Sequence, residues 1–257
     1  MRIVVCVKPV PHAPQLVDAT GRLARDGATL MNGTDENAVE AALQVRDRAG
    51  GAEVVLVALA PADSAEVLRP GLAMGADRAV VISGQEFEGS DLLGTSYALA
   101  EVIRAESADL VVFGALSSDG NGAMLWAAVA ERLDLPVVSR AVDYAVADGV
   151  LTATRQMEQG LDVVEVRLPA VLALSGEVNT PRYPSFKDVI AAKKRPVVVV
   201  AAGDGLIVDV ARVGVAGART TVRAIAEPPR RGAATVIVDD GSAADQVLVF
   251  LRDRSLI

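Results

Sequence analysis

Residues capable of acid–base or metal chemistry are few and widely separated in this chain of 257 residues. His12 is the single histidine and Cys6 the single cysteine, so the Cys/His cluster of a typical metal site is not available. No serine stands in the G-x-S-x-G pattern of a nucleophile elbow. The acidic pairs Asp35–Glu36 and Asp239–Asp240 are more typical of a helix start and a turn than of a catalytic pair. The sequence therefore predicts no catalytic residue and no metal site.

Three segments carry groups that could hold a nucleotide phosphate. The glycine-rich stretch Gly114–Asn121 runs from a predicted strand into a predicted helix, and backbone N–H groups at a helix start attract anions. In an open α/β sheet it would meet Lys8–Val10 and Met31–Glu36 where the strand order reverses. Such turns are also common as purely structural connections. The candidate nucleotide-binding residues are Lys8, Pro9, Val10, Asn32, Asp35, Asp119, Gly120, Asn121, Gly122 and Ala123.

The stretch 176–196, G-E-V-N-T-P-R-Y-P-S-F-K-D-V-I-A-A-K-K-R-P, has the character of a docking loop. Pro181 and Pro184 restrict φ and remove two backbone donors, which predicts a stiff loop that cannot pair as a strand. Such a loop presents aromatic side chains at little entropic cost, and its cations can steer acidic partners. The alternative is a surface connection whose aromatics fold back on the core. The predicted partner-docking residues are Tyr183, Phe186, Lys187, Lys193 and Lys194.

Alternating strand-like and helical runs would position these residues. The predicted strands are the Val-rich runs Ile3–Lys8, Glu53–Ala58, Arg78–Ile82 and Leu110–Gly114. The predicted helices are Asp35–Ala49, Asp63–Met74, Asp91–Ala105 and Met124–Leu133. Their expected N-caps are Thr34 or Asp35 for the first helix and Asp63 or Ser64 for the second. This order predicts an α/β fold with a doubly wound, mainly parallel sheet.

The later part of the chain predicts an antiparallel extension and an arm. Residues 141–147 and 150–156 flank the turn signal Asp148–Gly149, which indicates a hairpin, and residues 161–168 continue it. Beyond Val197 the alternation weakens, and the clearest element is a helix near Ala243–Arg252. We expect an α/β domain over residues 1–196, including the loop 176–196. We expect a C-terminal arm over 197–257 that packs on a partner subunit.

Bulk properties exclude several classes of protein. The formal net charge is −8, which argues against nucleic acid as the main partner. No uninterrupted apolar run approaches the ~18 residues of a membrane-spanning helix. A single cysteine excludes an intrachain disulfide and fits a reducing compartment, so we expect a cytoplasmic protein.

Five motifs, in order along almost the whole chain, resemble the beta subunit of electron transfer flavoproteins. They are I-V-V-C-V-K-P-V-P at 3–11, M-N-G-T-D-E-N-A-V-E-A-A-L at 31–43, L-A-M-G-A-D-R-A at 72–79, the stretch 176–196, and the C-terminal pair A-E-P-P-R-R-G-A at 226–233 with F-L-R-D-R-S-L-I at 250–257. The resemblance implies an adenine-nucleotide-binding, Rossmann-like domain and a heterodimer with an alpha subunit that carries most of the FAD site. Family beta subunits also hold AMP, or a second FAD.

Two departures from the family pattern affect the expected ligands. The family's phosphate loop reads approximately D-G-D-T-A-Q-V-G, whereas this chain has D-G-N-G-A-M-L-W at 119–126. Gly122 and Met124 replace polar side chains, and Trp126 replaces a glycine. We therefore expect weak or absent AMP and no second FAD. The family's R-E pair, which orients the flavin domain, reads Arg155–Gln156 here, so a hydrogen bond can remain but the charge is lost.

The resemblance also implies how the chain works. Phe186 stands where the family has an apolar anchor that enters a pocket on a partner dehydrogenase. The expected function is an electron-carrying beta-type subunit without substrate chemistry of its own. One alternative is a stand-alone adenine-nucleotide-binding module. Another is a small hydrolase or pyrophosphatase, for which Ser117, Ser118 and Asp119 are the only candidate polar residues.

Overall fold

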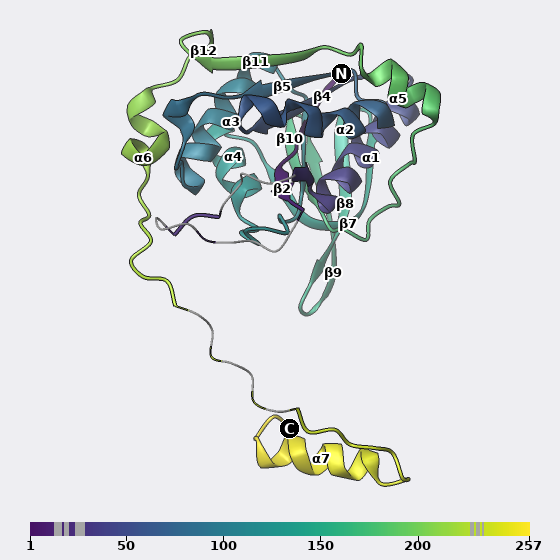
Figure 1. The fold of residues 1–257 in the computed structure, drawn as a ribbon. Coiled ribbons are helices and arrows are strands. Elements are labelled where there is room, and N and C mark those ends of the chain that lie inside the picture. Colours follow the sequence, from purple (N-terminus) through teal and green to yellow (C-terminus); the bar gives the residue numbers. More distant parts are fainter. Residues whose placement is uncertain (13–16, 18–20, 24–28, 227–228, 230–231, 233) are drawn as a thin grey trace. The chain divides into compact units, whose positions relative to one another are not determined.

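The computed structural model describes residues 1–12, 17, 21–23, 29–226, 229, 232 and 234–257. Its contacts divide the chain into a compact unit, Met1–Val222, and a second unit, Arg223–Ile257. Figure 1 labels the elements of both units. The helices are α1 (Gly33–Arg48), η1 (Ala62–Leu68), α2 (Arg69–Met74), η2 (Gln85–Phe87), α3 (Leu92–Glu106), α4 (Leu125–Leu133), α5 (Phe186–Ala192), η3 (Val210–Arg212), α6 (Gly214–Gly217) and α7 (Ala243–Asp253).

One large sheet organises the compact unit. Its strands are β1 (Arg2–Cys6), β4 (Glu53–Leu59), β5 (Arg78–Ile82), β6 (Leu110–Gly114), β7 (Val137–Ala147), β8 (Val150–Met157), β9 (Gly160–Arg167), β10 (Ala170–Leu174), β11 (Val197–Ala202) and β12 (Gly205–Leu206). They follow the order β12-β11-β5-β4-β1-β6-β10-β7-β8-β9. The pairs from β12 to β7 are parallel, and β7-β8-β9 are antiparallel. A separate antiparallel ribbon joins β2 (Pro9–Pro11) to β3 (Thr29–Met31).

Alternate side chains along the central strands contribute to two apolar cores. In β1, Ile3 and Val5 belong to the core that includes residues of α1 and α2, whereas Val4 and Cys6 belong to the core that includes residues of α3 and α4. All five residues of β10 are buried, as expected for a strand covered on both faces. The predicted α/β class with a doubly wound, mainly parallel sheet is confirmed.

Several element boundaries differ from the prediction. Helix α1 begins at Gly33, and its N-cap is Asn32, without a side-chain capping bond. Thr34 and Asp35, the predicted N-caps, therefore lie inside the first turn. Thr34 Oγ1 donates to Leu116 O, and Asp35 Oδ2 accepts from Lys8 N, so both side chains bond to the sheet edge instead of capping the helix. The second predicted helix is divided into η1 and α2, and its N-cap is Pro61 rather than Asp63 or Ser64. Pro70, in the first turn of α2, lacks the N–H that a continuous helix would use.

The stretch 176–196 contains a short helix, α5, that the proline-based prediction of a loop missed. Ser185 and Asp188 form a reciprocal capping box: Asp188 N donates to Ser185 Oγ at 3.3 Å, and Ser185 N donates to Asp188 Oδ2 at 3.0 Å. Strand β11 follows and pairs with β5 in the sheet. Residues 197–222 thus belong to the compact unit, although the sequence placed the start of the arm at Val197.

The second unit contains α7, which confirms the predicted terminal helix. Val247, Leu248, Val249 and Phe250 of this helix are all exposed. Most of the motif at 226–233 lies outside the described residues. Packing of this unit on a partner subunit stays a prediction.

Candidate functional site

The strand order reverses between β1 and β6, where β4 and β5 lie to one side and β6 to the other. Lys8 lies just beyond β1, and its backbone N–H donates to Asp35 Oδ2 at 2.8 Å. Its ammonium group contacts the turn after β6, at 2.7 Å from Asp119 Oδ1 and 3.2 Å from Ser117 Oγ. The three predicted segments therefore meet at the carboxyl edge of the sheet, as expected for an open α/β fold.

The amide of Asn32 ties these segments together. Its Nδ2 donates to Leu116 O and to Thr34 Oγ1, both at 2.9 Å, and its Oδ1 accepts from Ser118 N at 3.1 Å. The residue is 2% exposed. Because both polar ends of the amide are engaged within the protein, a nucleotide could use this side chain only after these bonds rearranged.

Lys8, Asn32, Asp35, Ser117 and Asp119 form what we call the sheet-edge cluster, and Asp35 is its buried carboxyl group. Burial raises its pKa to about 7, against the opposing effect of the hydrogen bond from Lys8 N and of other nearby donors. Burial, with a contribution from Asp35, also raises the pKa of the Cys6 thiol. Near pH 7 the Cys6 thiol is therefore neutral, and the Asp35 carboxyl group is partly protonated. Cys6 is a buried structural thiol rather than a nucleophile.

Gly114 allows α1 to approach the end of β6. A Cβ atom on this residue would lie 2.5 Å from Asp35 Oδ1 and 2.5 Å from Thr34 Oγ1. No ordinary Cβ contact is that short. The glycine is therefore required by the close packing of the helix start on the strand end.

The loop from Gly120 to Ala123 is exposed. Asn121 and Ala123 have φ values of 48° and 47°, so the loop turns through the left-handed region without a glycine at either position. Trp126 is half-buried against the core on the α3 and α4 side. Its Nε1 donates to Ala115 O at 3.2 Å, so the indole is fixed to the strand end. Of the remaining candidates, Pro9 and Val10 lie in β2, where Val10 is buried.

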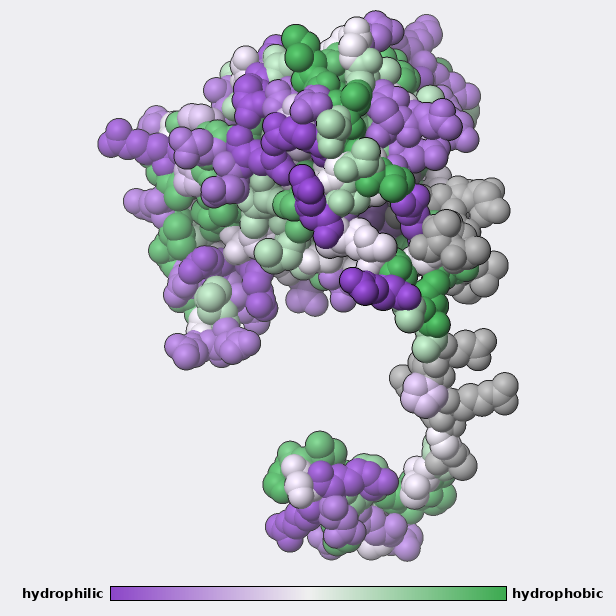
Figure 2. Space-filling model, turned by 90° about the vertical axis from the view of Figure 1, so that its left-hand side faces the viewer, coloured by the Kyte–Doolittle hydropathy of each residue, from purple (hydrophilic) through white to green (hydrophobic). Residues whose placement is uncertain are grey.

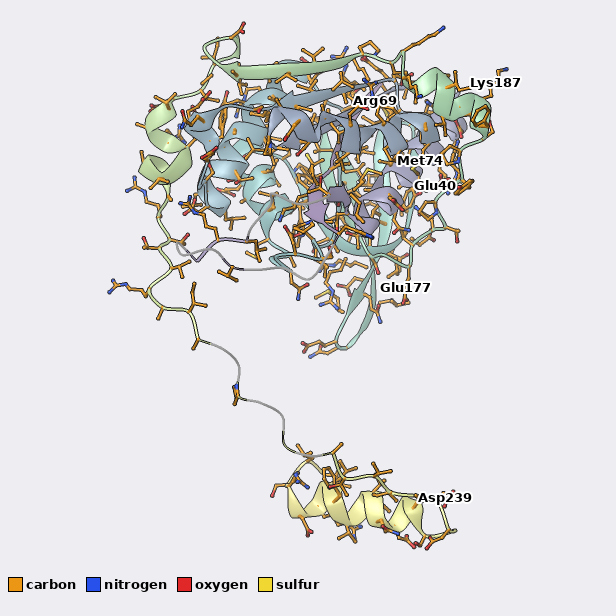
Figure 3. All side chains as sticks on the ribbon, viewed as in Figure 1. Glu40, Arg69, Met74, Glu177, Lys187 and Asp239 are labelled. Carbon is orange, nitrogen blue, oxygen red and sulfur yellow. The ribbon has the colours of Figure 1, made fainter. Side chains whose placement is uncertain are left out.

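The docking residues predicted in 176–196 lie on the surface. Tyr183 is 98% exposed and Phe186 is 81% exposed. The alternative in which these aromatics pack on the core is therefore not what the structure contains. Val189 and Ile190 of α5 are also exposed. Lys187, Lys193 and Lys194 are exposed as well, and Figure 3 shows the Lys187 side chain on the outer side of α5.

Arg155 and Gln156 lie on β8 rather than beside the sheet-edge cluster. Arg155 Nη2 contacts Asp162 Oδ2 of β9 at 3.1 Å, and these residues are cross-strand neighbours. Gln156 is exposed opposite Leu161. The β8–β9 hairpin projects from a different side of the compact unit than α5 (Figure 1).

The described part of the chain offers few other functional signals. It contains no group of three or more His, Cys, Asp or Glu residues that could hold a metal ion. No helix among the described residues has the length and apolarity needed to cross a bilayer. On the face shown in Figure 2, hydrophilic side chains cover much of the compact unit and are interrupted by smaller apolar patches.

Comparison with known proteins places the chain in a family. Residues 20–205 match the family model described as "Electron transfer flavoprotein domain". The chain is 34% identical to "Electron transfer flavoprotein subunit beta" of Mycobacterium tuberculosis, over 99% of both chains. It is 33% identical to the protein of the same name from Megasphaera elsdenii, over 100% of both. It is 39% identical to "Caffeyl-CoA reductase-Etf complex subunit CarD" of Acetobacterium woodii, over 77% of this chain and 78% of that one. The chain therefore belongs to the electron transfer flavoprotein family, among its beta subunits.

Proposed function

We propose that this chain is one half of a heterodimeric electron carrier. It pairs with an alpha-type subunit that holds FAD, and it docks a dehydrogenase whose electrons pass through that FAD to an acceptor in the cytoplasm. The beta-subunit relatives support the pairing, and the name of the Acetobacterium woodii relative couples such a subunit to a reductase complex. The chain itself acts as a carrier subunit rather than as a catalyst.

One observation carries the docking role. Tyr183, Phe186, Val189 and Ile190 are all exposed on and just before α5. The spacing of 186, 189 and 190 brings these side chains to one face of a short helix. An apolar helix face with an aromatic anchor fits a hydrophobic groove on a partner. Lys187, Lys193 and Lys194 flank it, which favours an acidic rim on that partner.

The sheet-edge cluster supports only a weak nucleotide site in this chain. The amide of Asn32 and the carboxyl of Asp35 are already engaged within the protein, and Lys8 is paired with Asp119. What remains for a phosphate is the exposed loop at 120–123. We therefore place FAD mainly in the alpha-type subunit and expect AMP to bind weakly or not at all.

The second unit supplies a surface for the alpha-type subunit. Helix α7 exposes Val247, Leu248, Val249 and Phe250, and a helix of this kind gains stability when another protein covers its apolar side chains. Coverage by the alpha-type subunit would explain why these apolar side chains are exposed in this chain on its own.

Co-expression with an alpha-type subunit tests the proposal. We expect both chains to elute together in equal amounts from size-exclusion chromatography, with visible flavin absorbance in the shared peak and none in this chain alone. The proposal is wrong if this chain stays a colourless monomer beside the alpha-type subunits offered to it. Release of one AMP per chain from the isolated protein on denaturation would contradict the weak or absent AMP binding, but not the pairing, because AMP is also expected in beta subunits of this family.

A further inference from the structure

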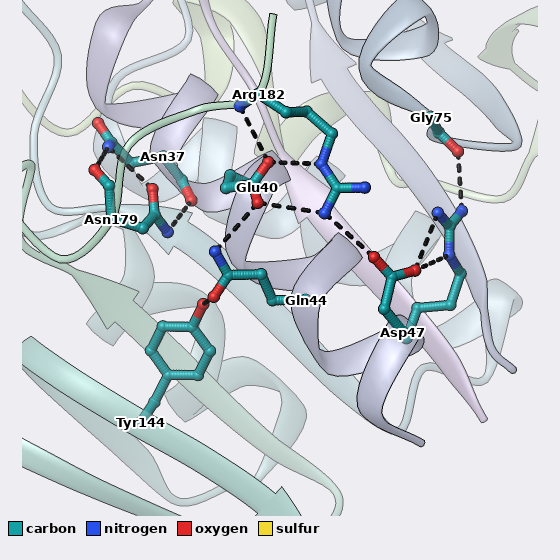
Figure 4. A network of polar contacts seen from close by, with 9 residues as sticks. Asn37, Glu40, Gln44, Asp47, Gly75, Tyr144, Asn179 and Arg182 are labelled. Carbon is teal, nitrogen blue, oxygen red and sulfur yellow. Dashed lines mark hydrogen bonds and ion pairs between the residues drawn. The ribbon is translucent and has the colours of Figure 1, made fainter. Parts of the chain in front are cut away.

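The main chain just before the exposed aromatics is fixed to α1 by an ion pair between a half-buried arginine and a buried glutamate. Arg182 donates to Glu40 through Nε at 2.8 Å, through Nη2 at 3.1 Å and through its backbone N–H at 3.1 Å. The Glu40 side chain is 6% exposed. Figure 4 shows the two side chains meeting in a bidentate arrangement, which fixes direction as well as distance.

A polar stripe along α1 extends this contact. Asn37, Glu40, Gln44 and Asp47 follow each other at helical spacing and face the incoming chain. Asn37 and Asn179 exchange hydrogen bonds, with Asn37 Nδ2 to Asn179 O at 2.8 Å and Asn179 Nδ2 to Asn37 O at 3.0 Å. The segment thus reaches Tyr183 already aligned on the helix (Figure 4).

The remaining members of the stripe complete the surroundings of the ion pair. Gln44 Nε2 donates to Glu40 Oε1 at 3.0 Å, and Asp47 Oδ2 accepts from Arg182 Nη2 at 3.1 Å. Tyr144 of β7 donates to Gln44 Oε1 at 2.9 Å. The ion pair is therefore supported by neighbours on three elements: α1, the segment itself and β7.

The far end of the segment is also held. Arg69 of α2 donates to Ala192 O, at the end of α5, at 3.0 Å and to Arg195 O, beyond that end, at 2.9 Å. Arg195 donates in turn to Gly75 O at 3.1 Å. Between these two anchors, Tyr183 and Phe186 are the most exposed of the large apolar side chains.

Electrostatics show that Glu40 is ionised in this arrangement. Burial alone would raise its pKa, but the hydrogen bonds from Arg182 and Gln44 outweigh burial, and the pKa lies below its ordinary value. Because Glu40 is buried, its desolvation offsets much of the attraction to the half-buried Arg182, so the pair adds little net stability. What it supplies is a unique position for the chain that carries it.

We propose that Glu40 and Arg182 are positioning residues for docking: their ion pair fixes the main chain beside Tyr183, so that the aromatic anchors are held out and pre-organised before a partner arrives. This inference rests on the docking role proposed above. Pre-organisation lowers the entropy lost on binding, so the pair acts on capture of the electron donor and not on the electron-transfer step.

Hydrogen exchange of the full chain tests the first half of the proposal. In Glu40→Gln, the amides of residues 178–186, apart from Pro181 and Pro184, should exchange about tenfold faster or more, since the backbone N–H of Arg182 loses its charged acceptor. Glu106→Gln is the matched control: Glu106 makes a bidentate pair with Arg78, with contacts of 2.8 and 2.6 Å, and its side chain is 15% exposed. This control should leave 178–186 unchanged. Equal exchange of these amides in wild type and Glu40→Gln would refute the positioning role.

Steady-state kinetics of the heterodimer test the second half, with the dehydrogenase that co-purifies with it from native cells as electron donor. Glu40→Gln should raise KM for the heterodimer about tenfold and leave kcat and reduction by dithionite unchanged. A fall in kcat at constant KM, or an unchanged KM, would overturn the inference. Phe186→Ala separates the two proposals. If it raises KM and Glu40→Gln does not, only the positioning role fails; if neither variant does, the docking role itself fails.

Discussion

The ammonium nitrogen of Lys8 lies 2.7 Å from Asp119 Oδ1, and the Asp119 side chain is fully buried. At the carboxyl edge of the sheet, this ion pair links the segment after β1 to the turn after β6. Lys8→Met should lower the free energy of unfolding by about 1–3 kcal/mol, because the buried carboxylate loses this cation. Urea titration measures the change. Lys187→Met, at an exposed lysine, is the control and should stay within about 0.5 kcal/mol of wild type. Equal midpoints for both variants would contradict this role of the pair.

The raised pKa of Asp35 makes stability depend on pH. The folded chain holds the Asp35 proton up to a pKa of about 7, whereas the ordinary value is 3.8. The stability that protonated Asp35 contributes to the folded state is fully present below pH 4. It is lost as pH rises toward 7, because only the unfolded chain releases the proton in that range. The loss is on the order of 3–4 kcal/mol for a shift of that size.

Asp35→Asn should remove this dependence, since an amide oxygen still accepts from Lys8 N but cannot ionise. Denaturant unfolding of both proteins between pH 4 and pH 8 gives the comparison. We expect the variant to gain stability relative to wild type as pH rises. Parallel pH profiles would mean that Asp35 titrates at its ordinary pKa in the folded protein.

Gly114→Ala should be strongly destabilising, because the new Cβ would lie 2.5 Å from Asp35 Oδ1. Overpacking of this kind costs about 1–3 kcal/mol. Gly122→Ala is the matched control, since a Cβ there meets no described atom within 4 Å. Thermal unfolding should show a lower Tm only for the first variant. A similar fall in both would mean that loop flexibility, rather than close packing, decides the outcome.

Phe186→Ala should leave stability almost unchanged and slow electron transfer from the donor dehydrogenase. The side chain is 81% exposed, so its removal should change the free energy of unfolding by less than about 0.5 kcal/mol. Loss of an anchor buried on docking should weaken capture by about 1–2 kcal/mol. Calorimetry of the variant and transfer rates at limiting donor provide the two measurements. A marked loss of stability would show that Phe186 is needed for folding.

The parts of the fold that follow from local pattern could be predicted from the sequence. Runs such as Leu110–Gly114 are buried on both faces, so their apolar character identifies them as strands. The sheet edge follows too, because parallel strands bring Lys8 and Asp119 to the same end. Asn32 lies at this edge as well, but nothing in its sequence neighbours indicates that its amide bonds to Leu116 and Ser118.

Two features were missed for different physical reasons. Helix α5 carries the local signal of a capping box, Ser185 with Asp188, which the nearby prolines obscured. The ion pair between Glu40 and Arg182 joins residues 142 positions apart, and no local periodicity encodes such a contact. Only the tertiary fold brings the two side chains together.

The anchoring of α5 at both ends has a mechanical consequence. Upstream the chain is attached to α1, and downstream it continues within a few residues into β11, which is bonded edgewise to β5. A force applied to α5 by a bound protein would therefore act on the Arg182–Glu40 contact and, in shear, on the β11–β5 hydrogen bonds, and not on a flexible linker. Helix α5 can then move only together with the compact unit.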